Sequence, residues 1–107
     1  MKLVLLLVSF AFAANVHAGD PAKGQKKAAQ VCAACHGPDG NKPSAPDQPV
    51  LAGQYEDYLV RALSDYKNGR RNNAIMKGFA GQLSKQDIED LAAWFSSQPR
   101  TSLHDQR

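Results

Sequence analysis

The stretch VCAACHGPDG, residues 31–40, contains the only two cysteines of the 107-residue chain, Cys32 and Cys35, with His36 directly after them. Cysteines at this spacing serve four kinds of chemistry: a structural zinc site, a redox-active dithiol, a short disulfide, or the covalent attachment of a haem. The rest of the sequence decides which of the four the chain supports.

Three of these four chemistries fit the sequence poorly. A structural zinc ion takes four protein ligands, whereas Cys32, Cys35 and His36 offer three, and neighbouring residues rarely reach one tetrahedral ion. A thioredoxin-like dithiol follows a β-strand, and the chain has no strand pattern of any length. A disulfide between the two cysteines would close a very small loop, so it would stabilise the fold little.

The spacing C-x-x-C-H is typical of the attachment of a c-type haem. On one helical turn, the sulfurs of Cys32 and Cys35 face the same side, where each can add to a vinyl group of one porphyrin. His36 then projects beneath the ring and binds iron through an imidazole nitrogen. We therefore predict one covalently attached haem c, with its iron, and His36 as one axial ligand.

Met76 is the predicted second axial ligand of the iron. It is the only methionine besides Met1, and polar residues surround it in an expected irregular segment, which is unusual for a methionine that merely fills a core. His104 is a weaker candidate because it lies in a polar tail. Thioether sulfur favours ferrous iron, and two filled axial positions keep oxygen and peroxide off the metal.

Residues 1–18 form a predicted signal peptide. Lys2 precedes an apolar run from Leu3 to Ala14, and the segment closes with the small residues that a signal peptidase recognises, so we expect cleavage after Ala18. The run of about 12 residues is shorter than the roughly 20 that span a bilayer. We therefore expect an exported, soluble mature chain, residues 19–107, without a membrane span.

The mature chain is predicted to be all-α, with three main helices. The first begins at Asp20 and Pro21 and continues to Cys35. The second covers residues 54–69 and ends at Gly69. The third begins at Ser84, with Asp87 three residues on, and ends before Pro99.

Two long segments between these helices are expected to be irregular. Residues 37–53 contain four prolines, which exclude regular structure, and residues 70–83 contain Gly78 and Gly81. A loop as long as 37–53 rarely serves as a simple connection, so we expect it to wrap around the haem. Residues 98–107 are expected to form a loose tail.

The balance of charge argues against nucleic-acid binding. The formal net charge is +3, and acidic and basic residues are interspersed without a long basic run. We expect a monomer. Four lysines form either a solvated surface or a ring that steers redox partners: Lys26, Lys27, Lys42 and Lys77.

The mature chain resembles a class I cytochrome c of the short bacterial periplasmic kind. The resemblance rests on GDPAKGQKKAAQVCAACHGPDG, PVLAGQ and IMKGFAGQLSKQDIEDLAAWFSSQ, in that order, and spans nearly all of residues 19–98. It implies a cytochrome c domain wrapped around one haem. It also implies that the Pro49 carbonyl accepts the second N–H of His36, and that Gly24 lies where the first and last helices cross, near Trp94.

The resemblance further implies a periplasmic electron carrier rather than an enzyme. Its partners would be a cytochrome bc-type complex and a terminal oxidase or reductase, and its tyrosines, Tyr55, Tyr58 and Tyr66, would pack the haem pocket. Two alternatives stay open. A peroxidase-like haem enzyme or gas sensor would need a displaceable sixth ligand, and a tethered subunit of a respiratory complex would keep its N-terminus uncleaved.

Overall fold

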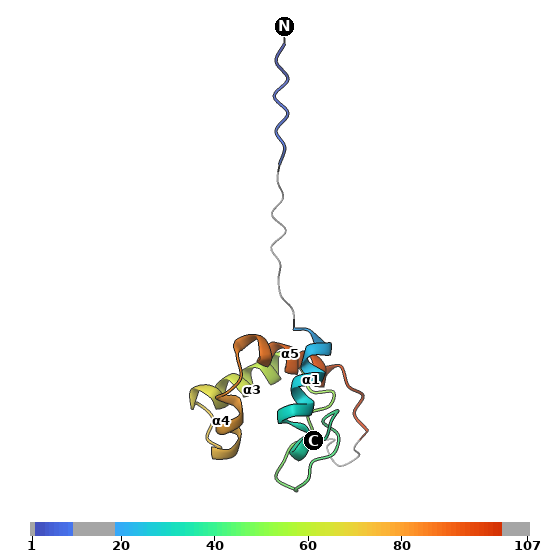
Figure 1. Cartoon of the computed structure of the whole chain (residues 1–107), viewed down its shortest axis with the longest axis vertical. Helices are drawn as coiled ribbons and strands as arrows, with labels where there is room; N and C mark the ends of the chain where they lie inside the picture. Colours follow the sequence, from blue (N-terminus) through green and yellow to red (C-terminus); the bar gives the residue numbers. More distant parts are fainter. Residues whose placement is uncertain (1, 10–18, 102–107) are drawn as a thin grey trace.

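The computed structural model describes residues 2–9 and 19–101, and the expected all-α class is confirmed for this part of the chain, which contains helices and no strand (Figure 1). Residues 2–9 form no helix and leave their apolar side chains exposed. No helix within these two ranges is long and apolar enough to cross a membrane. The helices are α1 (Pro21–Val31), α2 (Ala33–His36), α3 (Glu56–Asn68), α4 (Ala74–Ala80) and α5 (Lys85–Ser96).

The first predicted helix is in fact two. Helix α1 begins as expected, because the Asp20 side chain accepts hydrogen bonds from the N–H groups of Ala22 and Lys23. It ends at Val31, with Cys32 as its C-cap: the φ of Cys32 widens to −114°, although its N–H still donates to the Ala28 carbonyl. The short helix α2 then starts afresh, and the C-x-x-C-H motif occupies a turn of its own.

Helix α5 supplies most of the core and crosses α1 closely. Ser84 and Asp87 form the predicted capping box at its start. A Cβ atom on Gly24 would lie 1.9 Å from the Asp90 carbonyl oxygen, so only glycine allows this approach. The expected crossing is therefore present, and the buried Asp90 carboxylate also accepts the Asp20 N–H at 2.8 Å.

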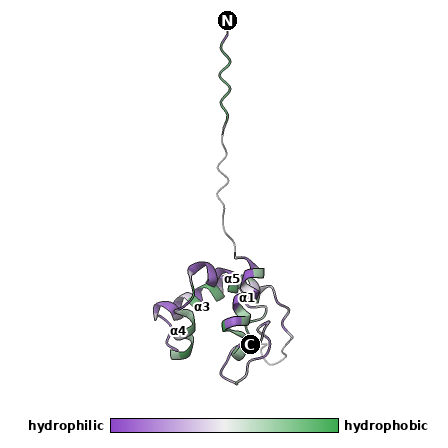
Figure 2. Cartoon of the chain, in the orientation of Figure 1, coloured by the Kyte–Doolittle hydropathy of each residue, from purple (hydrophilic) through white to green (hydrophobic). Residues whose placement is uncertain are grey.

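One apolar cluster joins α1, α3 and α5. Each helix carries both hydrophilic and hydrophobic residues (Figure 2), and the hydrophobic ones meet in a core formed by Ala28, Leu59, Leu83, Ile88, Leu91, Ala92 and Phe95. Helix α3 packs against α5 on one side and α4 on the other. It ends at Asn68, before Gly69 in the left-handed conformation at φ 77°, as predicted.

The prediction that residues 70–83 are irregular is wrong in part, because α4 covers Ala74–Ala80. The Asn73 side chain caps it by accepting hydrogen bonds from the N–H groups of Ile75 and Met76, both at 3.1 Å. Gly78 obscured this helix, since glycine has low helix propensity. Asparagine directly before the apolar residues was the available signal.

The loop at residues 37–53 is irregular, as predicted, and its two ends meet. The Leu51 N–H donates to the Gly40 carbonyl at 2.9 Å, closing the loop at its base. Gly40 has φ 81°, and a Cβ atom there would lie 2.8 Å from Phe95. A left-handed backbone and this close approach to α5 both require glycine.

Residues 98–101 do not form the loose tail expected there. Asn41 holds Pro99 and Thr101 through two side-chain hydrogen bonds, and Arg100 Nε donates to the Ala52 carbonyl at 2.9 Å. The rest of the expected tail, including His104, lies outside the described residues, as does the predicted cleavage site after Ala18.

Candidate functional site

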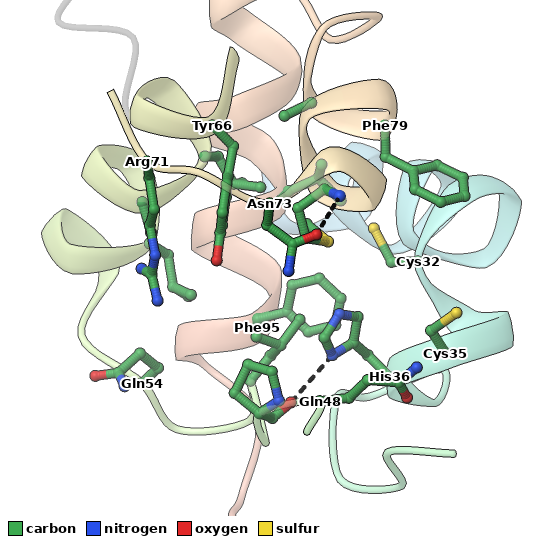
Figure 3. A pocket seen from close by; sticks show the side chains of 18 of the residues that line it. Cys32, Cys35, His36, Gln48, Gln54, Tyr66, Arg71, Asn73, Phe79 and Phe95 are labelled. Carbon is green, nitrogen blue, oxygen red and sulfur yellow. Dashed lines mark hydrogen bonds between the residues drawn. The ribbon is translucent and has the colours of Figure 1, made fainter. Parts of the chain in front are cut away.

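A cavity of about 530 Å³ opens between α2, α3, α4, α5 and the loop before α3 (Figure 3). Cys32, Cys35, His36 and Met76 all line it, together with Pro49. The structure therefore brings together every site residue predicted from the sequence. They come from three separate segments of the chain: the motif at α2, the proline-rich loop and α4.

The walls of the cavity are largely apolar. Leu59, Leu91 and Phe95 of the core form its inner surface. At its mouth, Ile75 and Phe79 of α4 line the cavity while remaining 68% and 43% exposed. Large apolar side chains left open around a cavity mark a binding site for an apolar ligand.

The two cysteines lie on one wall of the cavity, as Figure 3 shows. Both are half-buried free thiols. Burial, and to a lesser extent the neighbouring Cys35, raises the pKa of the Cys32 thiol to about 11. A redox-active dithiol needs the opposite shift, because the thiolate is its reactive form. The environment of Cys32 therefore argues against that chemistry.

The His36 side chain is buried, and the orientation of its ring is defined. Its Nδ1 lies 3.0 Å from the Pro49 carbonyl oxygen, the contact implied by the sequence resemblance. A carbonyl can only accept, so Nδ1 carries the proton. In the neutral ring Nε2 is then the nitrogen with the free lone pair, through which an imidazole binds a metal.

Met76 reaches the cavity from the first turn of α4, where it is half-buried. The Asn73 cap fixes the backbone at this point, since it holds the Met76 N–H directly. Met76 is therefore positioned by a regular, capped helix. This differs from the irregular, glycine-containing segment expected from the sequence.

Arg71 lines the same cavity and was missed in the sequence. Its guanidinium stacks on the Tyr66 ring, 4.8 Å from the centroid, and Nη1 donates to the Tyr58 hydroxyl at 3.3 Å. That hydrogen bond raises the pKa of Arg71, and a guanidinium stays charged in proteins in any case. Figure 3 shows Arg71 and Tyr66 side by side. Tyr55 is 79% exposed and does not line the cavity.

None of the four lysines considered as a docking ring lines the cavity. Lys26 and Lys27 belong to α1, where Lys27 lies 3.8 Å from the Asp87 carboxylate. Lys42 belongs to the proline-rich loop and Lys77 to α4, next to Met76. The four therefore come from three different elements, and one of them is already engaged by an acidic residue.

Comparison with known proteins places the chain in a family. The cytochrome c family model matches residues 21–99. The chain is 52% identical over 97 residues to cytochrome c4 of Pseudomonas aeruginosa, covering 90% of this chain and 47% of that protein. It is 45% identical over 84 residues to cytochrome c-554(548) of Halomonas halodenitrificans, covering 76% of this chain and 99% of that protein.

A solved structure agrees. The crystal structure of reduced recombinant cytochrome c4 from Pseudomonas stutzeri superposes with a TM-score of 0.72 at 48% identity, over 78% of this chain and 48% of that one. The chain belongs to the cytochrome c family, and its described helices have the cytochrome c fold. It spans about half the length of the cytochromes c4 that it matches.

Membership of this family supports a covalently bound haem c with its iron. The residues present fit such a group. The cavity offers apolar walls, two thiols on one wall, an imidazole whose free nitrogen is Nε2, a thioether and one cation. An apolar macrocycle that carries iron and carboxylates needs each of these partners.

Proposed function

We propose that the chain binds one haem c in this cavity, through thioether bonds to Cys32 and Cys35. His36 and Met76 would be the axial ligands of the iron. The observation that carries this proposal is that one apolar cavity is lined by both thiols, the imidazole and the thioether. A zinc ion, a redox-active dithiol or a disulfide would not use all four of these groups.

The chain's own residues prepare both axial groups. The Pro49 carbonyl holds the Nδ1 proton of His36, which fixes the tautomer and makes the imidazole a stronger donor. The Asn73 cap holds the backbone of Met76 at the start of α4. Apolar side chains such as Leu59 and Phe95 line the cavity between the two groups and would keep water out of it once haem is bound.

Arg71 and Tyr58 would bind the carboxylates of the haem. Arg71 is a permanent cation on the wall of an apolar cavity, and among the described residues no carboxylate oxygen lies within 4.0 Å of it. Its stacking on Tyr66 limits its rotation. A carboxylate of the ligand could therefore pair with a guanidinium whose orientation is already fixed.

With haem bound, the site supplies one-electron oxidation and reduction of iron. Met76 would fill the sixth position, so oxygen and peroxide would be excluded. We therefore propose an electron carrier rather than an enzyme, acting in the periplasm after removal of residues 1–18. Its redox partners would be a cytochrome bc-type complex and a terminal oxidase or reductase. The enzyme, sensor and tethered-subunit alternatives are not favoured by the relatives.

Mass spectrometry of the protein from cells able to mature c-type cytochromes tests the attachment. The expected mass is that of residues 19–107 plus one haem, resistant to extraction with acidified solvent. Cys32→Ser with Cys35→Ser should yield extractable haem or none. A wild-type protein whose mass includes no haem would contradict the proposal.

A further inference from the structure

Asn41 is a buried polar side chain that does not line the cavity. It is 6% exposed, and both polar atoms of its side chain are hydrogen bonded. Its N–H donates to Asp39 Oδ1 at 3.0 Å, and its Nδ2 to the Pro99 carbonyl at 2.9 Å. Its Oδ1 accepts the Thr101 N–H at 2.8 Å. A buried amide whose side chain is satisfied by one distant segment fixes that segment to the loop that carries the amide.

The position of Asn41 in the loop links it to both ends of the His36–Pro49 hydrogen bond. The residue after it, Lys42, donates its N–H to the His36 carbonyl at 3.1 Å. The residue before it, Gly40, accepts the Leu51 N–H at 2.9 Å, two residues beyond Pro49. A displacement of Asn41 would therefore move the donor, His36, relative to the acceptor, the Pro49 carbonyl.

The segment that Asn41 holds is itself fixed to the base of the loop. Arg100 Nε donates to the Ala52 carbonyl, and the Gly53 N–H donates to the Phe95 carbonyl at the end of α5, each at 2.9 Å. This segment contributes no residue to the lining of the cavity, so it holds the loop without being part of the site itself.

We propose that Asn41 is a positioning residue for His36. We term Asn41, Pro99 and Thr101 together the Asn41 clamp. By binding Pro99 and Thr101, Asn41 holds the proline-rich loop in place, so that the Pro49 carbonyl keeps its hydrogen bond to Nδ1 of His36. This inference rests on the proposed function, in which His36 binds haem iron. A held Nδ1 proton strengthens the imidazole as a donor, which stabilises ferric iron and lowers the reduction potential.

Two substitutions open the clamp in different ways. Asn41→Ala removes both side-chain bonds. Thr101→Pro removes only the N–H that Asn41 accepts, and Thr101→Ala is its matched control because it keeps that N–H. Ser84→Ala is a control for general destabilisation, since it removes the cap of α5 and leaves the loop intact.

The measurement is made on haem-loaded, reduced protein by nuclear magnetic resonance and redox titration. In Asn41→Ala, the Nδ1 proton of His36 should exchange with solvent about tenfold faster, because the loop opens more often, and the reduction potential should rise. Thr101→Pro should shift both quantities in the same direction by less. Thr101→Ala and Ser84→Ala should leave both at the wild-type values.

Each other outcome overturns the clamp. Unchanged exchange and potential in both Asn41→Ala and Thr101→Pro would show that the loop holds His36 without it. Equal shifts in Ser84→Ala would show a general loss of stability. If Asn41→Ala yields no folded protein, Thr101→Pro against Thr101→Ala decides alone. A wild-type protein without haem would instead overturn the proposed function, and the clamp with it.

Discussion

The crossing of α1 with α5 and the cavity wall formed by α4 differ in how closely their residues are packed against the rest of the chain. At the crossing, Gly24 lies directly against the backbone of Asp90, and the carboxylate of Asp90 is buried and hydrogen bonded. On α4, Ile75 and Phe79 remain exposed around an apolar cavity, and a Cβ atom on Gly78 would meet nothing within 4 Å. The chain's own packing closes the first region, whereas the second presents exposed apolar side chains to a cavity.

The largest expected effect comes from adding one methyl group at the crossing. Gly24→Ala would place its Cβ 1.9 Å from a backbone carbonyl oxygen, so α1 and α5 must separate. We expect a loss of about 3 kcal/mol or more in the free energy of unfolding. Urea unfolding of the haem-loaded protein measures it. A loss below roughly 1 kcal/mol would mean that the crossing is looser than described.

The next effect tests the cavity wall formed by α4, through the sulfur of Met76. Met76→Leu keeps the apolar volume but removes the sulfur that would bind the iron. The reduction potential should fall by on the order of 0.1 V, because a thioether ligand stabilises ferrous iron. Redox titration measures the potential. An unchanged value would mean that Met76 only fills space.

A smaller effect concerns the N-terminal cap of α5, one of the two helices that form the crossing. The hydrogen bond from the Ser84 N–H, above all, lowers the pKa of Asp87, with further contributions from the Ser84 side chain and Lys27. A carboxylate with a lowered pKa stabilises the fold above its unfolded pKa, near 3.9, and loses this contribution as pH falls through its folded pKa.

Asp87→Asn should therefore cost about 1 kcal/mol or less at neutral pH, after allowance for screening of this largely solvated group. The cost should disappear as the pH falls through the lowered pKa of Asp87 in the folded state. Thermal unfolding across a pH series measures it. Glu89→Gln is the control, because it removes the same charge from the same helix without touching the cap. A cost that stayed constant with pH would contradict the explanation.

The smallest expected effect is an increase in the free energy of unfolding. Gly78→Ala adds a methyl group where no atom lies within 4 Å, and alanine is the better helix former. We expect a stabilisation of about 0.5 kcal/mol. Paired with Gly24→Ala, it compares the same substitution in the two regions. Equal losses at both positions would remove the distinction between them.

Features encoded by neighbouring residues could be predicted from the sequence. Asp20 with Pro21 marked the start of α1, Ser84 with Asp87 that of α5, and Gly69 the end of α3. The motif at Cys32, Cys35 and His36 pointed to the cavity because its chemistry requires adjacent residues.

Features that depend on distant contacts could not be predicted. Asn41 pairs with Pro99 and Thr101 from the far end of the chain, and no local pattern marks such a bond. Arg71 is an exposed residue, and only the fold places it beside Tyr58 and Tyr66 of α3. Helix α4 was hidden for a different reason: Gly78 lowers helix propensity, and the Asn73 cap offsets it.

An absorption spectrum of the mature protein, oxidised and reduced, before and after carbon monoxide, tests the central claim most directly. The claim is that a covalently held haem is ligated by His36 and Met76. It predicts a c-type spectrum when reduced, a weak far-red methionine–iron band when oxidised, and no response to carbon monoxide. A missing far-red band together with a shift on carbon monoxide would contradict ligation by Met76, and the absence of any haem spectrum would contradict the whole account.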